Sequence, residues 1–243
     1  MDQTEKSLVS VILLGWERID FLSRAIESIF VQTYSEWELI LIDQKSISYR
    51  LAPMLSHHGK KIRIFFGEFD TPAAAAQYGA DHAEGEYLTF LDDDNWKHEA
   101  FIEKMLGFCR ITKSPVAVCN SRVVTEDGIE DPGVLCRTPK PLMINFGLLQ
   151  TDNYVDWGEI LISRDFLIKV GGMRIELMGY QDWDLMLRCA RALVFKGGIP
   201  VLPESLHYYR QHNNQLTWRP DKQILWKQLR KELKEEYDLR IAG

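Results

Sequence analysis

The sequence predicts an α/β fold with a mostly parallel central sheet and helices on both faces. Short runs of branched apolar residues alternate with longer segments whose apolar residues recur at helical spacing. The chain has 243 residues, enough to bury a large core. It is 46% hydrophobic and 26% charged, the usual balance of a folded globular domain. Together these observations favour one α/β domain.

The first half of the chain alternates strands with helices. Leu8–Leu14 is rich in branched residues and predicts a strand buried on both faces. Asp20 is expected to cap a helix that ends at Phe30, and Pro72 to open an alanine-rich helix that reaches Ala83. Three further strands are predicted, at Trp37–Ile42, Ile62–Phe66 and Tyr87–Leu91. Because such units cross over right-handedly, these strands should lie parallel.

The second half of the chain is less regular. We expect loops over residues 131–158, which are rich in Pro and Gly, and an amphipathic helix in the tail at 221–243. Residues 1–220 then form one domain. The other predicted elements are helices at Phe101–Arg110, Phe166–Val170 and Asp182–Ala192, and two short strands at Val116–Val118 and Val123–Val124.

Charge and cysteine content narrow the function classes. The net charge is −6, so the basic surplus of a nucleic-acid-binding domain is missing. The four cysteines lack metal-ligand spacing and are interpreted as reduced packing residues. The N-terminus does not resemble a signal peptide, and no apolar run reaches the ~20 residues of a membrane span. We therefore expect a cytoplasmic protein. For the tail helix, packing on the domain, dimerisation and peripheral membrane contact remain open.

Three adjacent carboxylates, Asp92, Asp93 and Asp94, directly follow the fourth predicted strand. Their mutual repulsion favours a hard divalent cation such as Mg²⁺ or Mn²⁺, although a solvated acidic turn is the alternative. Ligands of parallel sheets bind beyond the carboxyl ends of the strands. Gly15 and Asp43 end two other strands, so we expect them to converge on the same place.

Two further segments carry candidate chemistry. Asp182 and Asp184 begin a predicted helix, where a carboxylate acts either as a cap or as a general base. Because Asp182 and Asp184 are two positions apart on a helix, their side chains point to different faces, and they cannot both face one substrate in the same way. His212 lies in a polar segment, Tyr209–His212, and is either a metal ligand, a phosphate contact or a plain loop residue.

Four segments in order resemble family 2 inverting glycosyltransferases, over about Ser7 to Thr217. Val9–Ile12, Arg24–Ile29, Gln32–Tyr34 and Glu38–Asp43 are similar to the opening of that family. Glu84–Tyr87 with Phe90–Asp94 resembles its metal-binding segment, and Tyr209–His212 its closing motif. Gly171–Met173, Gln181–Leu185 and Arg188 resemble its acceptor-side motif.

The resemblance implies a GT-A fold, with a donor-binding half at 1–95 and an acceptor-binding half at 96–220. It implies a nucleotide-diphosphate sugar donor, a hydroxyl-bearing acceptor and Asp182 as the base. Asp94 and His212 would hold the Mn²⁺ or Mg²⁺. The donor-side residues would be Leu14, Gly15, Asp43, Gln44, Asp92 and Asp93, and the acceptor-side residues Trp157, Glu159, Gln181 and Trp183. Trp157 is the first choice for stacking on a sugar ring.

Three departures from the family pattern fall on the donor side. Trp16 and Glu17 stand where Tyr-Asn is usual, Gln44 replaces a common Asp, and Ala76 a common Arg. Because of these departures, the sequence does not specify the nucleotide of the donor. Lys45 or Arg18 is a candidate to replace the missing arginine. A nucleotidyltransferase-like enzyme and a non-catalytic nucleotide-sugar-binding relative remain the alternatives.

Overall fold

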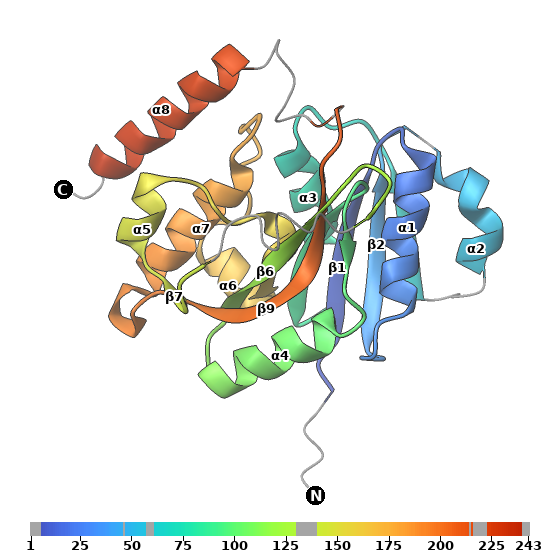
Figure 1. Cartoon of the computed structure of the whole chain (residues 1–243), viewed down its shortest axis with the longest axis horizontal. Helices are drawn as coiled ribbons and strands as arrows, with labels where there is room; N and C mark the ends of the chain where they lie inside the picture. Colours follow the sequence, from blue (N-terminus) through green and yellow to red (C-terminus); the bar gives the residue numbers. More distant parts are fainter. Residues whose placement is uncertain are drawn as a thin grey trace, which may run out of the picture.

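A computed structural model describes residues 6–45, 47–56, 61–129, 140–213, 215 and 223–239. A mixed nine-stranded sheet runs through the described part of the chain (Figure 1). Its order is β3-β2-β1-β4-β8-β6-β9-β5, and β7 pairs with β9. The strands are β1 (Val9–Gly15), β2 (Trp37–Asp43), β3 (Ile62–Phe66), β4 (Tyr87–Asp92), β5 (Trp96–Lys97), β6 (Val116–Val124), β7 (Met143–Ile144), β8 (Ile160–Ser163) and β9 (Ile199–Arg210).

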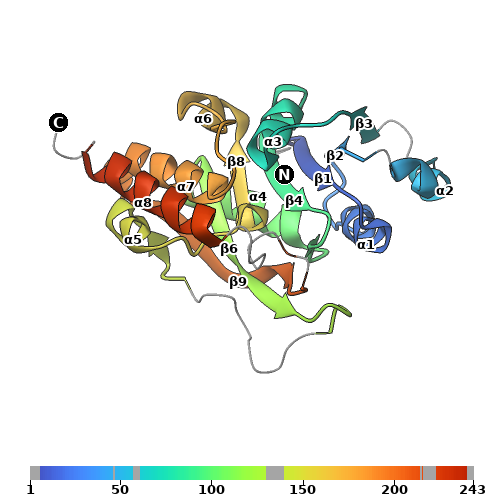
Figure 2. The same ribbon diagram turned by 90° about the horizontal axis from the view of Figure 1, so that it is seen from above.

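Helices cover both faces of this sheet (Figure 2). Alternate residues of β1 point to opposite sides because strand side chains have a period of two. Val11 and Leu13 pack with α1 and α4, whereas Ile12 and Leu14 pack with α3 and α7. The helices are α1 (Ile19–Phe30), α2 (Ala52–Ser56), α3 (Pro72–Asp81), α4 (Phe101–Thr112), α5 (Phe146–Thr151), α6 (Arg164–Lys169), α7 (Gln181–Ala192) and α8 (Gln223–Leu239).

The parallel half of the sheet confirms the prediction for the first half of the chain. β3, β2, β1 and β4 are parallel neighbours. Their register places Gly15 opposite Asp43, and Leu14 opposite Asp92. The carboxyl ends of three strands therefore meet at one edge, as the sequence predicts.

Several predictions for single elements are wrong. Asp20 does not cap α1; Arg18 holds the N-cap position, and Asp20 lies inside the first turn. The two short strands at 116–118 and 123–124 are one strand, β6, with register shifts on either side of Asn120. The predicted loop at 131–158 contains β7, α5 and a short 3₁₀ helix, Trp157–Glu159, and its residues 131–139 lie outside the described part.

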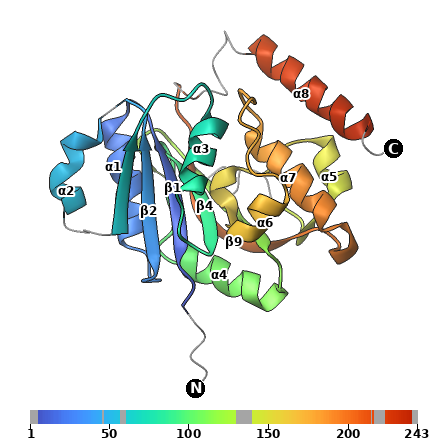
Figure 3. The ribbon, with the colours of Figure 1, turned by 180° about the vertical axis from the view of Figure 1, so that it is seen from behind.

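The C-terminal helix α8 packs beside α7 and α5 (Figure 3). Leu233 and Tyr237 are buried, and the Tyr237 hydroxyl donates to Asp184 Oδ1 at 2.7 Å. Trp226 packs edge-on against Tyr180, just before α7. In the described residues no helix is both long and apolar enough to span a bilayer. Of the four cysteines, Cys109, Cys119 and Cys189 are free and buried, as predicted; Cys136 lies outside the described residues.

Candidate functional site

The three carboxylates that follow β4 have different surroundings. Asp93 is 2% exposed, and its Oδ2 accepts from the backbone N–H of Trp16 at 2.8 Å. Asp92 accepts from the indole Nε1 of Trp157 at 2.8 Å. Asp94 is 8% exposed, and its Oδ2 lies 3.0 Å from His212 Nε2. Loops after β1, β4 and β9 thus close around one acidic cluster.

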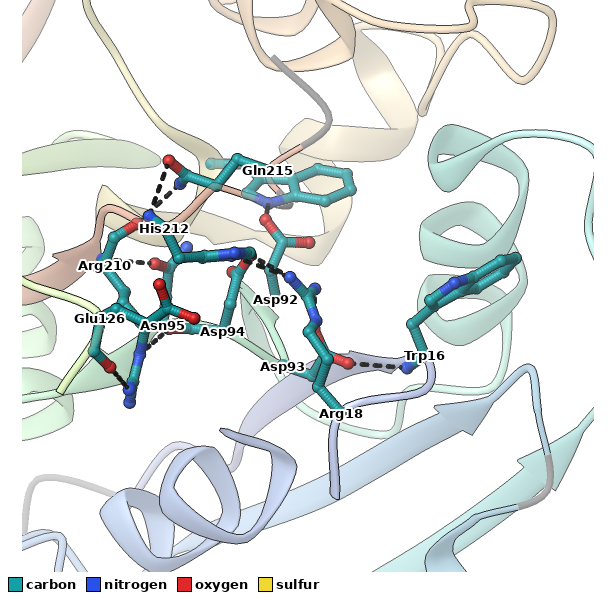
Figure 4. Close-up of polar contacts among 11 residues, drawn as sticks. Trp16, Arg18, Asp92, Asp93, Asp94, Asn95, Glu126, Arg210, His212 and Gln215 are labelled. Carbon is teal, nitrogen blue, oxygen red and sulfur yellow. Dashed lines mark hydrogen bonds and ion pairs between the residues drawn. The ribbon is translucent and has the colours of Figure 1, made fainter. Parts of the chain in front are cut away.

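The guanidinium of Arg18 lies inside this acidic cluster (Figure 4). Its Nη2 is 2.5 Å from Asp93 Oδ1. Its Nη1 is 3.0 Å from Asp94 Oδ2 and 2.9 Å from His212 Nε2. Because Nη1 carries two hydrogens, it can donate to both Asp94 Oδ2 and His212 Nε2. The lone pairs of these two atoms therefore point at the same guanidinium nitrogen.

The pKa values of Asp92 and Asp93 are both raised, mainly by burial. Burial raises the pKa of Asp93 to about 6, against the opposing effect of Arg18. Burial, with the charges of Asp94 and Asp156, raises the pKa of Asp92 well above its ordinary value. The charge of Arg18 therefore does not fully offset the burial of Asp93.

Asp94 and His212 form a donor pair that suits a divalent cation. Carboxylate oxygen and imidazole nitrogen are common ligands of Mn²⁺. Their 3.0 Å separation equals the edge of an octahedron with ligands about 2.1 Å from the ion. No cluster of three or more His, Cys, Asp or Glu side chains able to hold a metal occurs among the described residues. Two protein ligands with substrate phosphates are the usual way of holding Mg²⁺, so the residues fit such an ion.

Residues around His212 hold its loop in place. Arg210 donates from Nε to the carbonyl of Asp94 at 3.0 Å, and its backbone N–H donates to Asn95 Oδ1 at 3.0 Å. Gln215 donates to the carbonyl of Arg210 at 2.6 Å. The segment after β9 is thereby tied to the segment after β4, which explains how residues 118 positions apart meet.

The predicted donor-side residues lie together at the ends of β1 and β2. The Leu14 side chain is buried, while its carbonyl accepts from Asp93 N–H at 3.1 Å. Gly15 accepts from Gln44 N–H at 3.1 Å. Asp43 is fully buried and accepts from three backbone N–H groups, of Lys45, Ile47 and Ser48. Its carboxylate therefore shapes the turn after β2.

An aromatic side chain and a lysine stand at the rim of this region. Trp16 is 43% exposed, and the ammonium of Lys45 lies 4.5 Å from the centre of its ring. Trp16 is one of the departures from the family pattern, and Lys45 directly follows another, Gln44. An exposed indole with a neighbouring cation suits a planar, negatively charged ligand.

Asp182 lies in the first turn of α7. Its Oδ1 accepts from Asn153 Nδ2 at 3.1 Å and from the N–H of Trp183 at 2.7 Å. Asp184, by contrast, is fully buried between Arg174 and Arg188. The two carboxylates therefore face different surroundings, as predicted, and only Asp182 is partly open to solvent.

The stacking role predicted for Trp157 is wrong in this conformation. Trp157 is 3% exposed, and its ring stacks on Phe90 with the centroids 5.8 Å apart. Trp183 is 1% exposed and donates to the carbonyl of Leu149. Their indoles have no open face for a sugar because both complete the hydrophobic core. Trp157 instead acts on the acidic cluster, by its hydrogen bond to Asp92.

Glu159 and Gln181 also lie beneath the surface. Glu159 is fully buried in an ion pair with Lys140 at 2.8 Å and also accepts from Ser121. Gln181 is partly buried at the start of α7. The carboxylate of Glu159 is engaged in these internal contacts. The prediction that Glu159 contacts the acceptor directly is therefore contradicted.

Sequence reasoning missed the central position of Arg18 and the support from Arg210, Asn95 and Asn153. Arg18 was considered only as a replacement cation. The available signal was its place in the loop after β1, at the edge where parallel sheets bind ligands. Asn153 lay in a segment expected to be loop, with no pattern to connect it to Asp182.

Comparisons with known proteins identify the fold and the family of this chain. The profile described as "Glycosyl transferase family 2" matches residues 10–171. TuaG of Bacillus subtilis, a putative teichuronic acid biosynthesis glycosyltransferase, is 30% identical over 128 residues, 51% of this chain and 50% of TuaG. WfgD of Escherichia coli, a UDP-Glc:alpha-D-GlcNAc-diphosphoundecaprenol beta-1,3-glucosyltransferase, is 34% identical over 104 residues, 41% of each chain. The matched region thus spans half or less of these relatives.

The structure of S. aureus TarS, residues 1–349 with UDP-GlcNAc, superposes with a TM-score of 0.67. The match covers 86% of this chain and 60% of the TarS chain at 16% identity, so it speaks for the fold alone. It confirms the predicted GT-A class. The family match also decides against the nucleotidyltransferase alternative. With residues 10–171 matched, the chain belongs to glycosyl transferase family 2.

Proposed function

We propose that the chain transfers a sugar from a nucleoside-diphosphate donor to a hydroxyl acceptor with inversion at the anomeric carbon. The observation that carries this proposal is the pairing of Asp94 with His212 at the edge where β1, β2 and β4 end. Structures of TarS with UDP-GlcNAc and with UDP support a nucleotide-sugar donor. The names of TuaG and WfgD support a glycan or lipid-linked acceptor.

Asp94 and His212 would hold a divalent cation, Mn²⁺ or Mg²⁺. Such an ion, when bound, offsets the charge that develops on the leaving diphosphate. Asp92 and Asp93 complete the acidic edge, with Gly15 and Gln44 beside it for the nucleotide. In the proposed division of the domain, residues 1–95 bind the donor and 96–220 the acceptor.

Asp182 is the proposed general base. Its carboxylate lies in the first turn of α7, beside the partial positive charge of a helix N-terminus. The acceptor oxygen attacks the anomeric carbon as its proton passes to Asp182, and the bond to the diphosphate breaks on the opposite face. One displacement inverts the carbon, so no enzyme nucleophile is needed.

Three free, buried cysteines suit a reducing compartment, and we place the reaction in the cytoplasm. The acidic composition argues against a nucleic-acid acceptor. Contact with a membrane surface and dimerisation are not part of the proposal, since α8 is engaged with α7 through Tyr237.

A donor screen tests this function. Sugar nucleotides based on UDP, GDP and dTDP are incubated with Mn²⁺, and release of the nucleoside diphosphate is measured. Once a donor is found, Asp182→Asn should lower turnover by about 10²–10⁴-fold while donor binding is kept.

The matched control is Asp165→Asn, the same change in the first turn of α6, where the side chain is exposed. This variant should keep wild-type turnover. Equal turnover in the two variants would remove Asp182 from the role of base. Donor binding without turnover in the wild type, across a range of acceptors, would favour the non-catalytic relative.

A further inference from the structure

Arg18 stands where a metal ion would have to bind. Its Nη1 lies 3.0 Å from Asp94 Oδ2 and 2.9 Å from His212 Nε2, the two atoms that suit a divalent cation. An ion about 2.1 Å from each of these atoms would be coordinated by the same lone pairs that now accept hydrogen bonds from Arg18. A cation and the guanidinium therefore cannot occupy this position together.

The guanidinium is strongly held but incompletely satisfied. It pairs with two carboxylates that are at most 8% exposed, and such charge-assisted contacts contribute more than neutral hydrogen bonds. Its Nε, however, is buried and has no hydrogen-bond partner among the residues that the structure describes. A buried donor without a partner costs free energy, which lowers the cost of leaving this position.

The backbone near Arg18 allows such a departure. Arg18 is the N-cap residue of α1 with φ −99° and ψ 85°, outside the helix, and its side chain makes no capping bond. Its side chain is 29% exposed. It can thus rotate toward solvent without unwinding α1 or disturbing the strands.

We propose that Arg18 is a built-in counter-ion that occupies the metal position of the donor-free protein and gives way when a divalent cation and a nucleoside diphosphate enter. This inference rests on the proposed function, since it assumes that Asp94 and His212 bind the cation. Without a nucleotide, the cation must displace Arg18 from its carboxylates. With a nucleotide, the diphosphate supplies oxygen ligands to the cation and a new anionic partner for the guanidinium.

Two consequences follow from this exchange. Divalent cations bind weakly to the nucleotide-free protein, and removing the guanidinium strengthens their binding. Nucleotide and cation also bind cooperatively, and by linkage each raises the affinity of the other by the same factor. Part of this coupling comes from Arg18 and disappears with it.

The experiment measures Mn²⁺ affinity by electron paramagnetic resonance, with and without UDP or the nucleoside diphosphate found in the donor screen. Arg18→Met keeps most of the side-chain bulk and removes the charge. Without nucleotide, it should bind Mn²⁺ at least about tenfold more tightly than the wild type, because two charged hydrogen bonds no longer compete. The nucleotide should raise Mn²⁺ affinity less in this variant than in the wild type.

Two control variants locate the effect. Arg24→Met removes the same charge from α1 at a residue whose guanidinium lies 5.0 Å from the Trp96 ring centre, and it should leave Mn²⁺ affinity unchanged. Adding Asp94→Asn to Arg18→Met should abolish the gained affinity. Arg18→Gln serves as a second variant if the methionine variant does not fold.

The outcomes separate this inference from the proposed function. If Arg18→Met and the wild type bind Mn²⁺ equally, the counter-ion role is overturned while metal-assisted transfer stands. If Arg24→Met raises the affinity as much as Arg18→Met, only net charge matters, and the role is again overturned. If no variant binds Mn²⁺ even with nucleotide and turnover persists in EDTA, both the counter-ion role and the metal-assisted mechanism are wrong.

Discussion

At the scale of single residues, a titratable lysine is buried just after the acidic cluster in the sequence. Lys97 follows the acidic cluster by three positions and is 2% exposed. Its ammonium donates to Thr89 Oγ1 and to the carbonyl of Gly158, and it lies 3.9 Å from the ring centre of Phe101. Burial lowers the pKa of Lys97 from 10.5 to about 7. Folding therefore releases a proton from this residue above neutral pH.

The stability of the protein should respond to this proton. Between about pH 7 and 10.5 the unfolded chain binds a proton at Lys97 that the folded chain does not, so raising the pH stabilises the fold. Relative to Lys97→Met, the free energy of unfolding of the wild type should rise by up to about 1.4 kcal/mol per pH unit. Urea unfolding at pH 7, 8 and 9 measures this difference; a difference independent of pH would contradict the assignment.

At the scale of elements, α8 packs against the segment that leads into Asp182, the proposed general base. The ring of Trp226 occupies the space in which a Cβ on Gly179 would lie, and Gly179 comes three residues before Asp182. Arg174 links α8 to α7, since it pairs with Glu236 at 2.8 Å and with Asp184 at 3.1 Å. Burial and the nearby Asp184 raise the pKa of the Tyr237 hydroxyl, which donates to Asp184 Oδ1. The tail helix α8 is thus packed against α7 and the segment before it.

A single methyl group tests this packing. Gly179→Ala places a Cβ 1.6 Å from the indole of Trp226, so the ring and α8 must shift. We expect a loss of about 1–3 kcal/mol in the free energy of unfolding, the usual cost of overpacking. Gly107→Ala in α4 is the matched control, because nothing lies within 4 Å of its added Cβ. Thermal unfolding compares the two, and an equal stability would show that α8 is not packed against Gly179.

At the scale of the whole molecule, one sheet connects the proposed donor and acceptor sides. β4 pairs with β1 on one side and with β8 on the other, so the parallel half is continuous with a second half that mixes parallel and antiparallel pairs. The acidic cluster lies where loops from both halves meet. Ligand binding at this seam should therefore stabilise the molecule as a unit.

Metal removal tests this coupling in the intact protein. At about 100 times its Kd, a nucleotide stabilises by ~2.7 kcal/mol, which for a chain of this size raises Tm by roughly 5–10 °C. We expect UDP, or the nucleotide of the true donor, to give this shift with Mn²⁺ and only a small part of it in EDTA. Asp94→Asn should behave in Mn²⁺ as the wild type does in EDTA. A shift that is equal in Mn²⁺ and EDTA would exclude metal-assisted donor binding.

Strands that form a clear apolar run in the sequence were predicted, whereas strands defined mainly by pairing with distant segments were missed. β1 to β4 were predicted because each is a short apolar run flanked by polar residues. β9 was missed, although it has twelve residues, because Pro200, Pro203 and Glu204 interrupt its apolar pattern. β8, with four residues, was missed as well. These strands are defined by pairing with β6, which no local pattern records.

The candidate site divides in the same way. The sequence by itself determined the family, the parallel half of the sheet and the convergence of Gly15, Asp43 and Asp92, because strand ends in one sheet meet at one edge. Only the tertiary structure decided that Arg18 lies between Asp94 and His212, and that the indole of Trp157 faces Asp92. Arg18 and His212 are 194 positions apart. Contacts of that range depend on how loops close over the sheet, and periodicity along the chain carries no information about them.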